Sequence, residues 1–198
     1  HTASLSGNDA VFSGALAQTG VAEGQDFRQW TDIARSLSRY PKVSSKGRAR
    51  IAVLTYSGAA GIVSADFLSV FGLEIAELSS GTLYALRTVS PSWMPVSNPV
   101  DLWPAVERNG ARKAYGTAIR ALCADSGVDG ILVHAFAGNF ALNFDLSELA
   151  RTAKAAEKPL ICWLLGERQE TGIFQEQARS QGILVFRELF RSVECMAA

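Results

Sequence analysis

Histidine and cysteine are scarce in this sequence. Its 198 residues include two histidines, His1 and His134, and three cysteines, Cys123, Cys162 and Cys195. The cysteines are odd in number, each lies in an apolar context, and none has the spacing of a metal ligand. We therefore expect no metal site and no disulfide framework, but reduced core thiols in a cytoplasmic protein.

An excess of charge of one sign is also missing. The 19 lysines and arginines balance the 19 aspartates and glutamates, and the basic residues between 42 and 50 are interrupted by Ser and Gly. Binding to a nucleic-acid backbone relies on a positive field that such a chain lacks. No apolar stretch reaches membrane-spanning length, and the first residues show no signal-peptide pattern. We therefore expect neither nucleic acid nor membrane as a partner.

What the sequence does contain is apolar material, since 48% of its residues are hydrophobic. That content is enough for one sizeable core, or for a core with a small appendage. At the N-terminal end, the N-cap types Ser6, Asn8 and Asp9 and the pair Thr19-Gly20 bracket a short expected helix. A second helix is expected over about residues 26–40, and the Pro-, Ser-, Lys- and Gly-containing stretch 41–47 predicts a linker.

The chain therefore divides into a helical segment with linker, residues 1–48, and a domain, residues 49–198, in which apolar runs alternate with helical periods. The expected strands are the apolar runs Ile51–Thr55, Leu73–Glu77, Gly130–His134, Leu160–Leu165 and Ile183–Phe186. Helices are expected near 60–70, 82–89, 112–125, 145–157 and 171–181, and from 188 onward. Continuous apolar strands joined by helices are typical of a parallel sheet covered on both faces. We predict an α/β fold, a flavodoxin-like doubly wound parallel sheet preceded by an N-terminal helical segment.

The turn after the first expected strand is the main candidate site. It reads Ser57-Gly58-Ala59-Ala60-Gly61 and leads directly into a helix. A strand that enters a helix through small residues leaves backbone N–H groups unpaired, and the helix dipole adds positive potential there. Such a turn can bind an anionic oxygen such as phosphate. The alternative is that Gly58 and Gly61 merely allow a tight turn, because a short glycine pair is weaker than a full phosphate-binding fingerprint.

Two later loops are expected at the same edge of the sheet, because ligands of open α/β sheets bind beyond the carboxyl ends of the strands. The loop 91–102 contains Asn98 and Asp101, which can either order the loop or contact a ligand. His134 ends the third expected strand and can be a hydrogen-bonded core residue or act near the phosphate. Gly138 lies in the loop that follows.

Three ordered motifs resemble a known family. They are HTASLSGNDAVFSGALAQTGV at the start of the chain, IAVLTYSGAAGIVSAD from Ile51 to Asp66, and NPVDL from Asn98 to Leu102. In this order and spacing they are similar to motifs of the NDP-forming acyl-CoA synthetases, which include ADP-forming acetate–CoA ligase and are relatives of succinyl-CoA synthetase. The resemblance spans essentially the whole chain. It implies a fragment made of the family's phosphohistidine segment and its second ligase-type domain.

The resemblance implies an acid–thiol ligase reaction, acyl-CoA + ADP + phosphate ⇌ acid + ATP + CoA, through an acyl phosphate and a phosphohistidine. His1 stands at the family's carrier histidine, and the turn Ser57–Gly61 matches a helix N-terminus that binds its phosphoryl group. ADP or ATP, Mg and CoA are implied for the parent enzyme, but none is expected on this fragment alone. The implied partners are the Rossmann-type CoA-binding domain, the first ligase-type domain and the ATP-grasp domain of the same enzyme.

Two departures from the family's pattern restrict the function that the resemblance implies. The turn has alanines where relatives have further glycines, so Ala59 or Ala60 can obstruct the approach of a phosphate. Leu102-Trp103-Pro104 replaces the small polar residues after NPVD, and we infer no acyl substrate. The alternative function is a non-catalytic regulatory or interaction module of a larger protein, such as a protein acetyltransferase. A self-sufficient small-molecule binder is a third reading, and we expect no ligase turnover from the isolated fragment.

Overall fold

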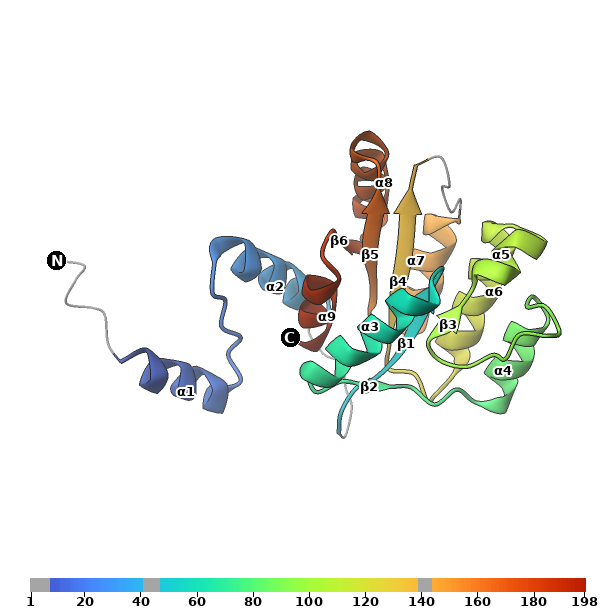
Figure 1. The fold of residues 1–198 in the computed structure, drawn as a ribbon. Helices are drawn as coiled ribbons and strands as arrows, with labels where there is room; N and C mark the ends of the chain where they lie inside the picture. Colours follow the sequence, from blue (N-terminus) through green and yellow to red (C-terminus); the bar gives the residue numbers. More distant parts are fainter. Residues whose placement is uncertain (1–7, 41–46, 139–143) are drawn as a thin grey trace. The chain divides into compact units, whose positions relative to one another are not determined.

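A computed structural model describes residues 8–40, 47–138 and 144–198 of the chain (Figure 1). These residues fall into two compact units, a pair of helices before residue 41 and an α/β unit after it. The boundary between residues 48 and 49 that we draw from the sequence stays a prediction. Among the described residues, no helix is both long enough and apolar enough to cross a membrane.

The N-terminal unit consists of two capped helices. Helix α1 (Asp9–Thr19) has Asn8 as its N-cap, whose side chain accepts a hydrogen bond from the N–H of Ala10, and it ends at Gly20 with φ 69°. Only a residue that tolerates the left-handed region fits that C-cap easily. Helix α2 (Phe27–Arg39) begins after Asp26, whose carboxylate accepts the N–H of Gln29 at 2.7 Å. Both helices agree with the sequence-based expectation.

The α/β unit is built on a six-stranded sheet in which every recorded pairing is parallel. Its order is β2-β1-β4-β5-β6, and β3 pairs with β1 as well. The strands are β1 (Arg50–Thr55), β2 (Glu74–Ile75), β3 (Val100–Asp101), β4 (Gly130–Ala137), β5 (Leu160–Gly166) and β6 (Leu184–Phe186). The predicted doubly wound parallel sheet is thereby confirmed, and the five expected strands are all present.

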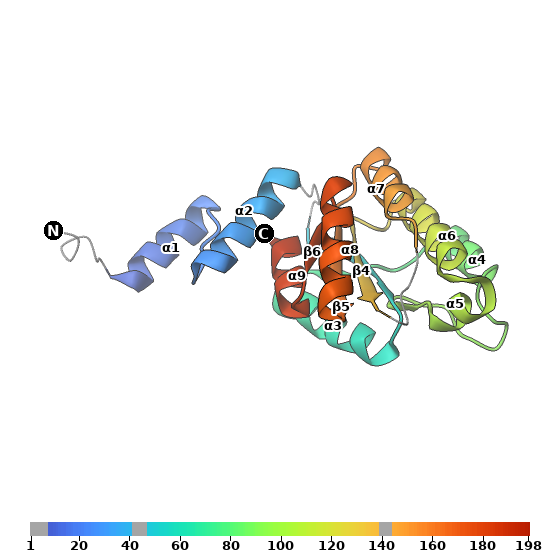
Figure 2. The same cartoon turned by 90° about the horizontal axis from the view of Figure 1, so that it is seen from above.

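Helices cover both faces of the sheet. They are α3 (Gly58–Val70), α4 (Ser80–Arg87), α5 (Trp103–Asn109), α6 (Ala111–Ala124), α7 (Leu146–Ala155), α8 (Arg168–Ser180) and α9 (Leu189–Ala197). Helices α3 and α9 share one face, where the ring of Phe190 makes edge-on contacts with Phe67 and Phe71. Helices α4 to α7 lie together on the opposite face (Figure 2). The apolar strands are therefore buried from both sides, as their composition requires.

Two short elements were not expected from the sequence. Strand β3 has two residues and lies within the expected loop 91–102, and α5 has seven and lies between that loop and the helix expected near 112–125. A two-residue strand is too short to show a hydrophobic period. Helix α5 lacks a side-chain N-cap and begins with a proline in its first turn, at Pro104. Proline fits the first turn because the N–H that it lacks would have no helical partner there.

All three cysteines are buried and reduced. Burial raises the pKa of Cys123 to about 11, although the positive charge of Lys158 opposes the shift. Burial alone raises the pKa of Cys162 to about 12. A thiol with so high a pKa carries almost no thiolate at neutral pH, and the thiolate is the reactive form. Cys123 and Cys162 are therefore inert, and all three cysteines are buried thiols of the core, as the sequence predicts.

The carboxylate of Asp125 ties the start of α4 to the end of α6. It accepts hydrogen bonds from the N–H of Ser79 at 2.9 Å, the hydroxyl of Thr82 at 2.6 Å and the N–H of Gly127 at 2.9 Å. Burial alone would raise the pKa of Asp125, but these hydrogen bonds outweigh it and lower the pKa to about 2. The charged carboxylate thus stabilises the folded state.

We predict that Asp125→Ala lowers the free energy of unfolding by about 1–3 kcal/mol at neutral pH, because three donors lose a charged acceptor. Since the folded-state pKa lies below the unfolded value, this stabilisation is present above about pH 4 and is lost as the pH falls toward 2. Urea unfolding at several pH values measures it. The exposed carboxylate variant Asp66→Ala is the control, and equal losses in both variants would contradict the assignment.

Candidate functional site

The turn between β1 and α3 is open to solvent. Gly58 and Ala59 are exposed, and Ser57 and Ala60 are half-buried. Ser57 is the N-cap of α3, and its hydroxyl accepts the N–H of Ala60 at 3.5 Å, which is a long and weak hydrogen bond. Within the described part of the chain, the N–H groups of Gly58 and Ala59 have no recorded acceptor. These two donors sit at the positive end of the α3 dipole and can receive an anion.

Gly61 has a different role from Gly58. Its N–H donates to the carbonyl of Ser57 at 3.0 Å, and the residue is buried. A Cβ on Gly61 would lie 3.0 Å from Cβ of Pro99 and 3.3 Å from a methyl of Thr55, so a side chain there would require these neighbours to move. Gly61 therefore lets α3 pack closely against the NPVDL segment. The candidate hydrogen-bond donors for an anion are therefore the N–H groups of Gly58 and Ala59.

Asn98 completes the edge of the sheet beside β1. Its amide oxygen accepts the N–H of Val53 at 2.9 Å, and its amide nitrogen donates to the carbonyls of Ile51 at 2.8 Å and Ala76 at 3.0 Å. Strand β2 pairs with the first residues of β1 and β3 with the last ones. The Asn98 side chain bridges the gap between them. Of its two expected roles, the structure places it in the ordering of the loop.

Asp101 lies between the turn and the start of α5. One carboxylate oxygen accepts the N–H of Trp103 at 3.0 Å. The other faces the turn, because a Cβ on Gly58 would lie 3.6 Å from it. The residue is half-buried, so this second oxygen borders the open end of α3. Asp101 thus combines a local turn hydrogen bond to the N–H two residues on with a negative charge next to the candidate donors.

His134 is fully buried beneath the turn. Its Nδ1 lies 2.8 Å from the hydroxyl of Thr55, and its Nε2 lies 2.9 Å from the hydroxyl of Ser64. The Thr55 hydroxyl also contacts the carbonyl of Ser57 at 2.8 Å, and the Ser64 hydroxyl contacts the carbonyl of Ala60 at 2.9 Å. We call this set the Thr55–His134–Ser64 relay. Both ring nitrogens have partners, so His134 supports the turn from below rather than touching a ligand.

The imidazole of His134 is neutral. It is 0% exposed, and the indole of Trp163 packs edge-on with the ring centroids 4.9 Å apart. Burial lowers the pKa of His134 to about 3. The hydroxyl of Tyr115 donates to the His134 carbonyl at 3.1 Å and fixes the backbone at this point. A neutral ring has one N–H donor and one acceptor, which decides how the relay distributes its protons.

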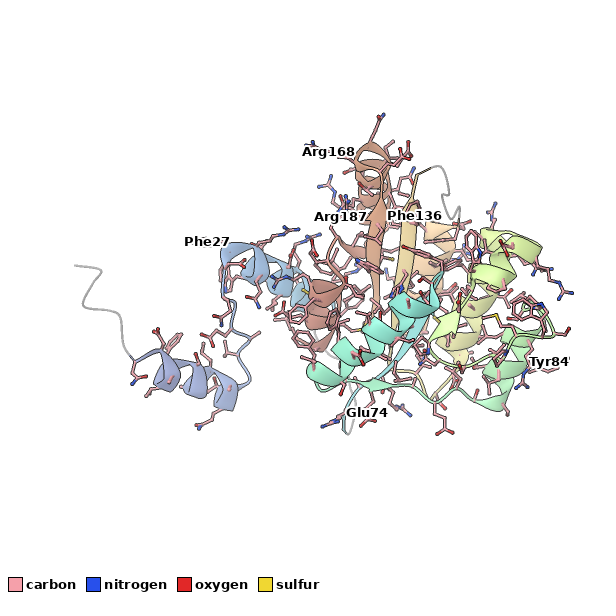
Figure 3. All side chains as sticks on the ribbon, viewed as in Figure 1. Phe27, Glu74, Tyr84, Phe136, Arg168 and Arg187 are labelled. Carbon is pink, nitrogen blue, oxygen red and sulfur yellow. The ribbon has the colours of Figure 1, made fainter. Side chains whose placement is uncertain are left out.

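The remaining predicted positions lie elsewhere. Gly138 has φ 145° at the end of β4, and a Cβ on it would meet the Glu167 side chain of the β5–α8 connection. Figure 3 labels two residues at the carboxyl ends of the strands, Phe136 on β4 and Arg187 directly after β6. His1 lies outside the described residues, as do residues 139–143 of the predicted loop. Where the structure describes the chain, no three His, Cys, Asp or Glu side chains gather into a group that could bind a metal.

Sequence reasoning missed Thr55 and Ser64, the two hydroxyl residues of the relay. Each is buried among apolar neighbours, Thr55 at the end of β1 and Ser64 on the inner face of α3. The available signal was a polar residue at a position where the strand or helix period requires burial. A buried hydroxyl needs a hydrogen-bonding partner, so such a position points to a second polar group nearby.

Comparison with known proteins identifies the class to which this arrangement belongs. ADP-forming acetate–CoA ligase II of Archaeoglobus fulgidus is 32% identical over 196 residues, which are 99% of this chain and 28% of that protein. The alpha subunit of ADP-forming acetate–CoA ligase II of Pyrococcus furiosus is 32% identical over 102 residues, 52% of this chain and 21% of the subunit. No family model matches the sequence.

The fold is shared with a solved synthetase. Dinucleotide-forming acetyl-coenzyme A synthetase 1 of Ca. Korarchaeum cryptofilum, in complex with phosphate and ADP, aligns with a TM-score of 0.77 and 20% identity over 97% of this chain and 40% of its own. The chain belongs to the NDP-forming acyl-CoA synthetase family, as its motifs predict. Within that family it is a segment related to the ADP-forming acetate–CoA ligases, spanning 28% of the first of these relatives.

We predict that Asn98→Ala lowers the free energy of unfolding by about 3 kcal/mol, because three backbone groups lose their partner between β2 and β3. Urea unfolding of the purified chain measures the loss. The neighbouring exposed residue supplies the control, and Ser97→Ala is expected to change stability by less than about 0.5 kcal/mol. A comparable small change for Asn98→Ala would show that the bridge contributes little.

The buried neutral imidazole makes stability depend on pH. Because the pKa of His134 is lower in the folded than in the unfolded state, stability is full above about pH 6.5 and falls as the unfolded chain takes up a proton. The slope approaches about 1.4 kcal/mol per pH unit between the two pKa values. In His134→Gln this contribution is absent. Denaturant unfolding of both proteins from neutral to mildly acidic pH measures it, and parallel curves would refute it.

Proposed function

We propose that the chain is the part of an NDP-forming acyl-CoA synthetase that supplies a carrier histidine and one phosphate-binding helix N-terminus. In the proposed reaction, phosphate attacks acyl-CoA to give an acyl phosphate and CoA, and a ring nitrogen of His1 then takes the phosphoryl group from the acyl phosphate, with the carboxylate of the acid as the leaving group. The phosphohistidine transfers it to ADP. The observation that carries the proposal is the open turn at Gly58 and Ala59 in a chain related along 99% of its length to an ADP-forming acetate–CoA ligase.

The chemistry of the turn suits a phosphorylated imidazole. The N–H groups of Gly58 and Ala59 and the α3 dipole favour the phosphoryl oxygens. The carboxylate of Asp101 beside Gly58 would weaken, without abolishing, the binding of a bare anion such as inorganic phosphate, but it can accept a hydrogen bond from a ring N–H. A phosphohistidine formed by attack of one ring nitrogen, while the other nitrogen keeps its proton, presents both a phosphoryl group and a ring N–H. The turn and Asp101 together therefore match this group better than free phosphate.

Catalysis at such a site would be electrostatic. Phosphoryl transfer asks little covalent chemistry of the protein beyond the nucleophile, so positioning and fixed dipoles supply most of the rate. Histidine is a suitable carrier because its ordinary pKa, about 6.5, leaves a neutral nucleophilic nitrogen at physiological pH. Ala59 is exposed, so its methyl group does not seal the turn. The alanines that replace family glycines thus leave the donors accessible.

Other parts of the parent enzyme would hold its substrates. We propose a Rossmann-type CoA-binding domain, a first ligase-type domain and an ATP-grasp domain as partners, with ADP or ATP, Mg and CoA bound there. The solved relative with phosphate and ADP supports this assignment for nucleotide and phosphate. A cytoplasmic location accords with this chemistry and is part of the proposal. The alternative of a regulatory module predicts a parent protein without an ATP-grasp domain.

The test is phosphoryl labelling of the parent enzyme with radioactive ATP. We expect an acid-labile, base-stable label in the unaltered protein and none in His1→Asn, since an amide cannot form the phosphoramidate. Asp66→Asn, which changes an exposed residue of α3, is expected to keep the full label. A label that persists at full level in His1→Asn would exclude His1 as the carrier.

A further inference from the structure

The Ser57–Gly58 peptide connects the buried relay to the proposed anion site. The carbonyl of Ser57 and the N–H of Gly58 belong to the same planar peptide unit. The carbonyl contacts the hydroxyl of Thr55 at 2.8 Å, and that hydroxyl lies 2.8 Å from Nδ1 of His134. The N–H is one of the two open donors of the turn. A hydrogen bond donated to a carbonyl polarises its amide and strengthens the N–H as a donor.

The relay has fewer protons than contacts. A neutral His134 supplies one N–H, and Thr55 and Ser64 each supply one O–H, so three protons serve four contacts. The Thr55 oxygen also accepts the N–H of Ser57 at 3.0 Å, a contact that has its own proton and leaves the Thr55 O–H able to donate. If Nδ1 carries the ring proton, it donates to Thr55, which donates to the Ser57 carbonyl, while Ser64 donates to either Nε2 or the Ala60 carbonyl. If Nε2 carries it, Ser64 donates to the Ala60 carbonyl, and Thr55 has to choose between Nδ1 and Ser57.

We infer that His134 is a positioning residue for the phosphoryl group, and that its Nδ1–H tautomer is the form coupled to anion binding. In this tautomer the donors form one unbroken chain, from the ring N–H through the Thr55 hydroxyl and the Ser57 carbonyl to the N–H of Gly58 and the anion. Coupling is reciprocal, so a bound anion favours the same tautomer. This inference rests on the proposed function, because it assumes that the turn receives a phosphoryl group.

The two ends of the relay give the inference a matched pair of variants. Thr55→Val keeps the shape of the side chain and removes the hydroxyl that polarises the Ser57–Gly58 peptide, which is also the acceptor of the Ser57 N–H at 3.0 Å. Ser64→Ala removes the buried hydroxyl on the other side of the ring and leaves the Nδ1–H path intact. At His134, an asparagine side chain can place an N–H near the position of Nδ1, whereas a leucine has no polar atom. His134→Asn is therefore the conservative variant and His134→Leu the disruptive one.

The experiment is a titration of the 198-residue chain with inorganic phosphate at neutral pH, followed by NMR of the backbone amides and the His134 ring nitrogens. We expect the Gly58 and Ala59 amide signals to shift, and the ring to show a protonated Nδ1 in the bound state. Thr55→Val and His134→Leu are expected to weaken binding about tenfold, which corresponds to about 1.4 kcal/mol. Ser64→Ala and His134→Asn are expected to bind within about twofold of the unaltered chain. A variant is compared only where its spectrum shows the folded state.

The outcomes separate the two claims. If phosphate shifts the Gly58 and Ala59 amides but Thr55→Val binds as tightly as the unaltered chain, the inference about His134 is overturned and the proposed function stands. Equal weakening in Thr55→Val and Ser64→Ala, or a bound state with the proton on Nε2, overturns it as well. If no amide of the turn responds in the unaltered chain, the phosphate-binding role proposed for the turn fails first.

Discussion

The carboxyl end of β1 has to be paired on both sides before the turn after it can be held in place. On one side β4 supplies a continuous parallel partner. On the other side β2 pairs with the first residues of β1 and β3 with the last ones, and the Asn98 amide makes the hydrogen bonds to β1 in the gap between these two short strands. Unpaired backbone groups inside a covered sheet are costly, so this closure fixes the position of Thr55 and of the peptide units after it. The geometry of the turn depends on that pairing.

The NPVD segment joins the sheet edge to the candidate site. Asn98 bridges the strands, Pro99 packs on the bare Cα of Gly61, and Val100 is buried in the core. Asp101, one residue further on, places a carboxylate oxygen beside Gly58. Four consecutive residues thus serve pairing, packing and electrostatics around one turn. The NPVD motif can be recognised in the sequence, but the sequence alone does not show which of its residues serves pairing, packing or electrostatics.

Much of the fold could be predicted because its main elements have strong periods. The apolar runs of β1, β4 and β5 and the caps of α1 and α2 are local signals, and the structure agrees with them. Strand β3 and helix α5 could not be predicted, because two residues have no period and α5 has no capping side chain. They form through contacts with β1 and α6, which no local pattern encodes.

The candidate site could be predicted only in part. The open turn was predictable from the glycines, but the different roles of Gly58 and Gly61 depend on Pro99, which is distant in sequence. The buried partners of His134 come from β1 and α3, so their meeting is a tertiary event. The role of His1 stays a prediction that comes from resemblance. The local sequence predicts the turn as a candidate site, and tertiary packing determines which of its N–H groups are open to a ligand.

The buried thiols have a practical consequence for studying movement in this protein. Because Cys123, Cys162 and Cys195 are all enclosed, the native surface offers no fast-reacting sulfur among the described residues. A cysteine introduced at exposed Ala59 would therefore be the preferred target of a maleimide dye, with no need to replace the native residues first. A second fluorophore attached near the amino terminus would then let single-molecule energy transfer follow how often the segment that carries His1 approaches the turn.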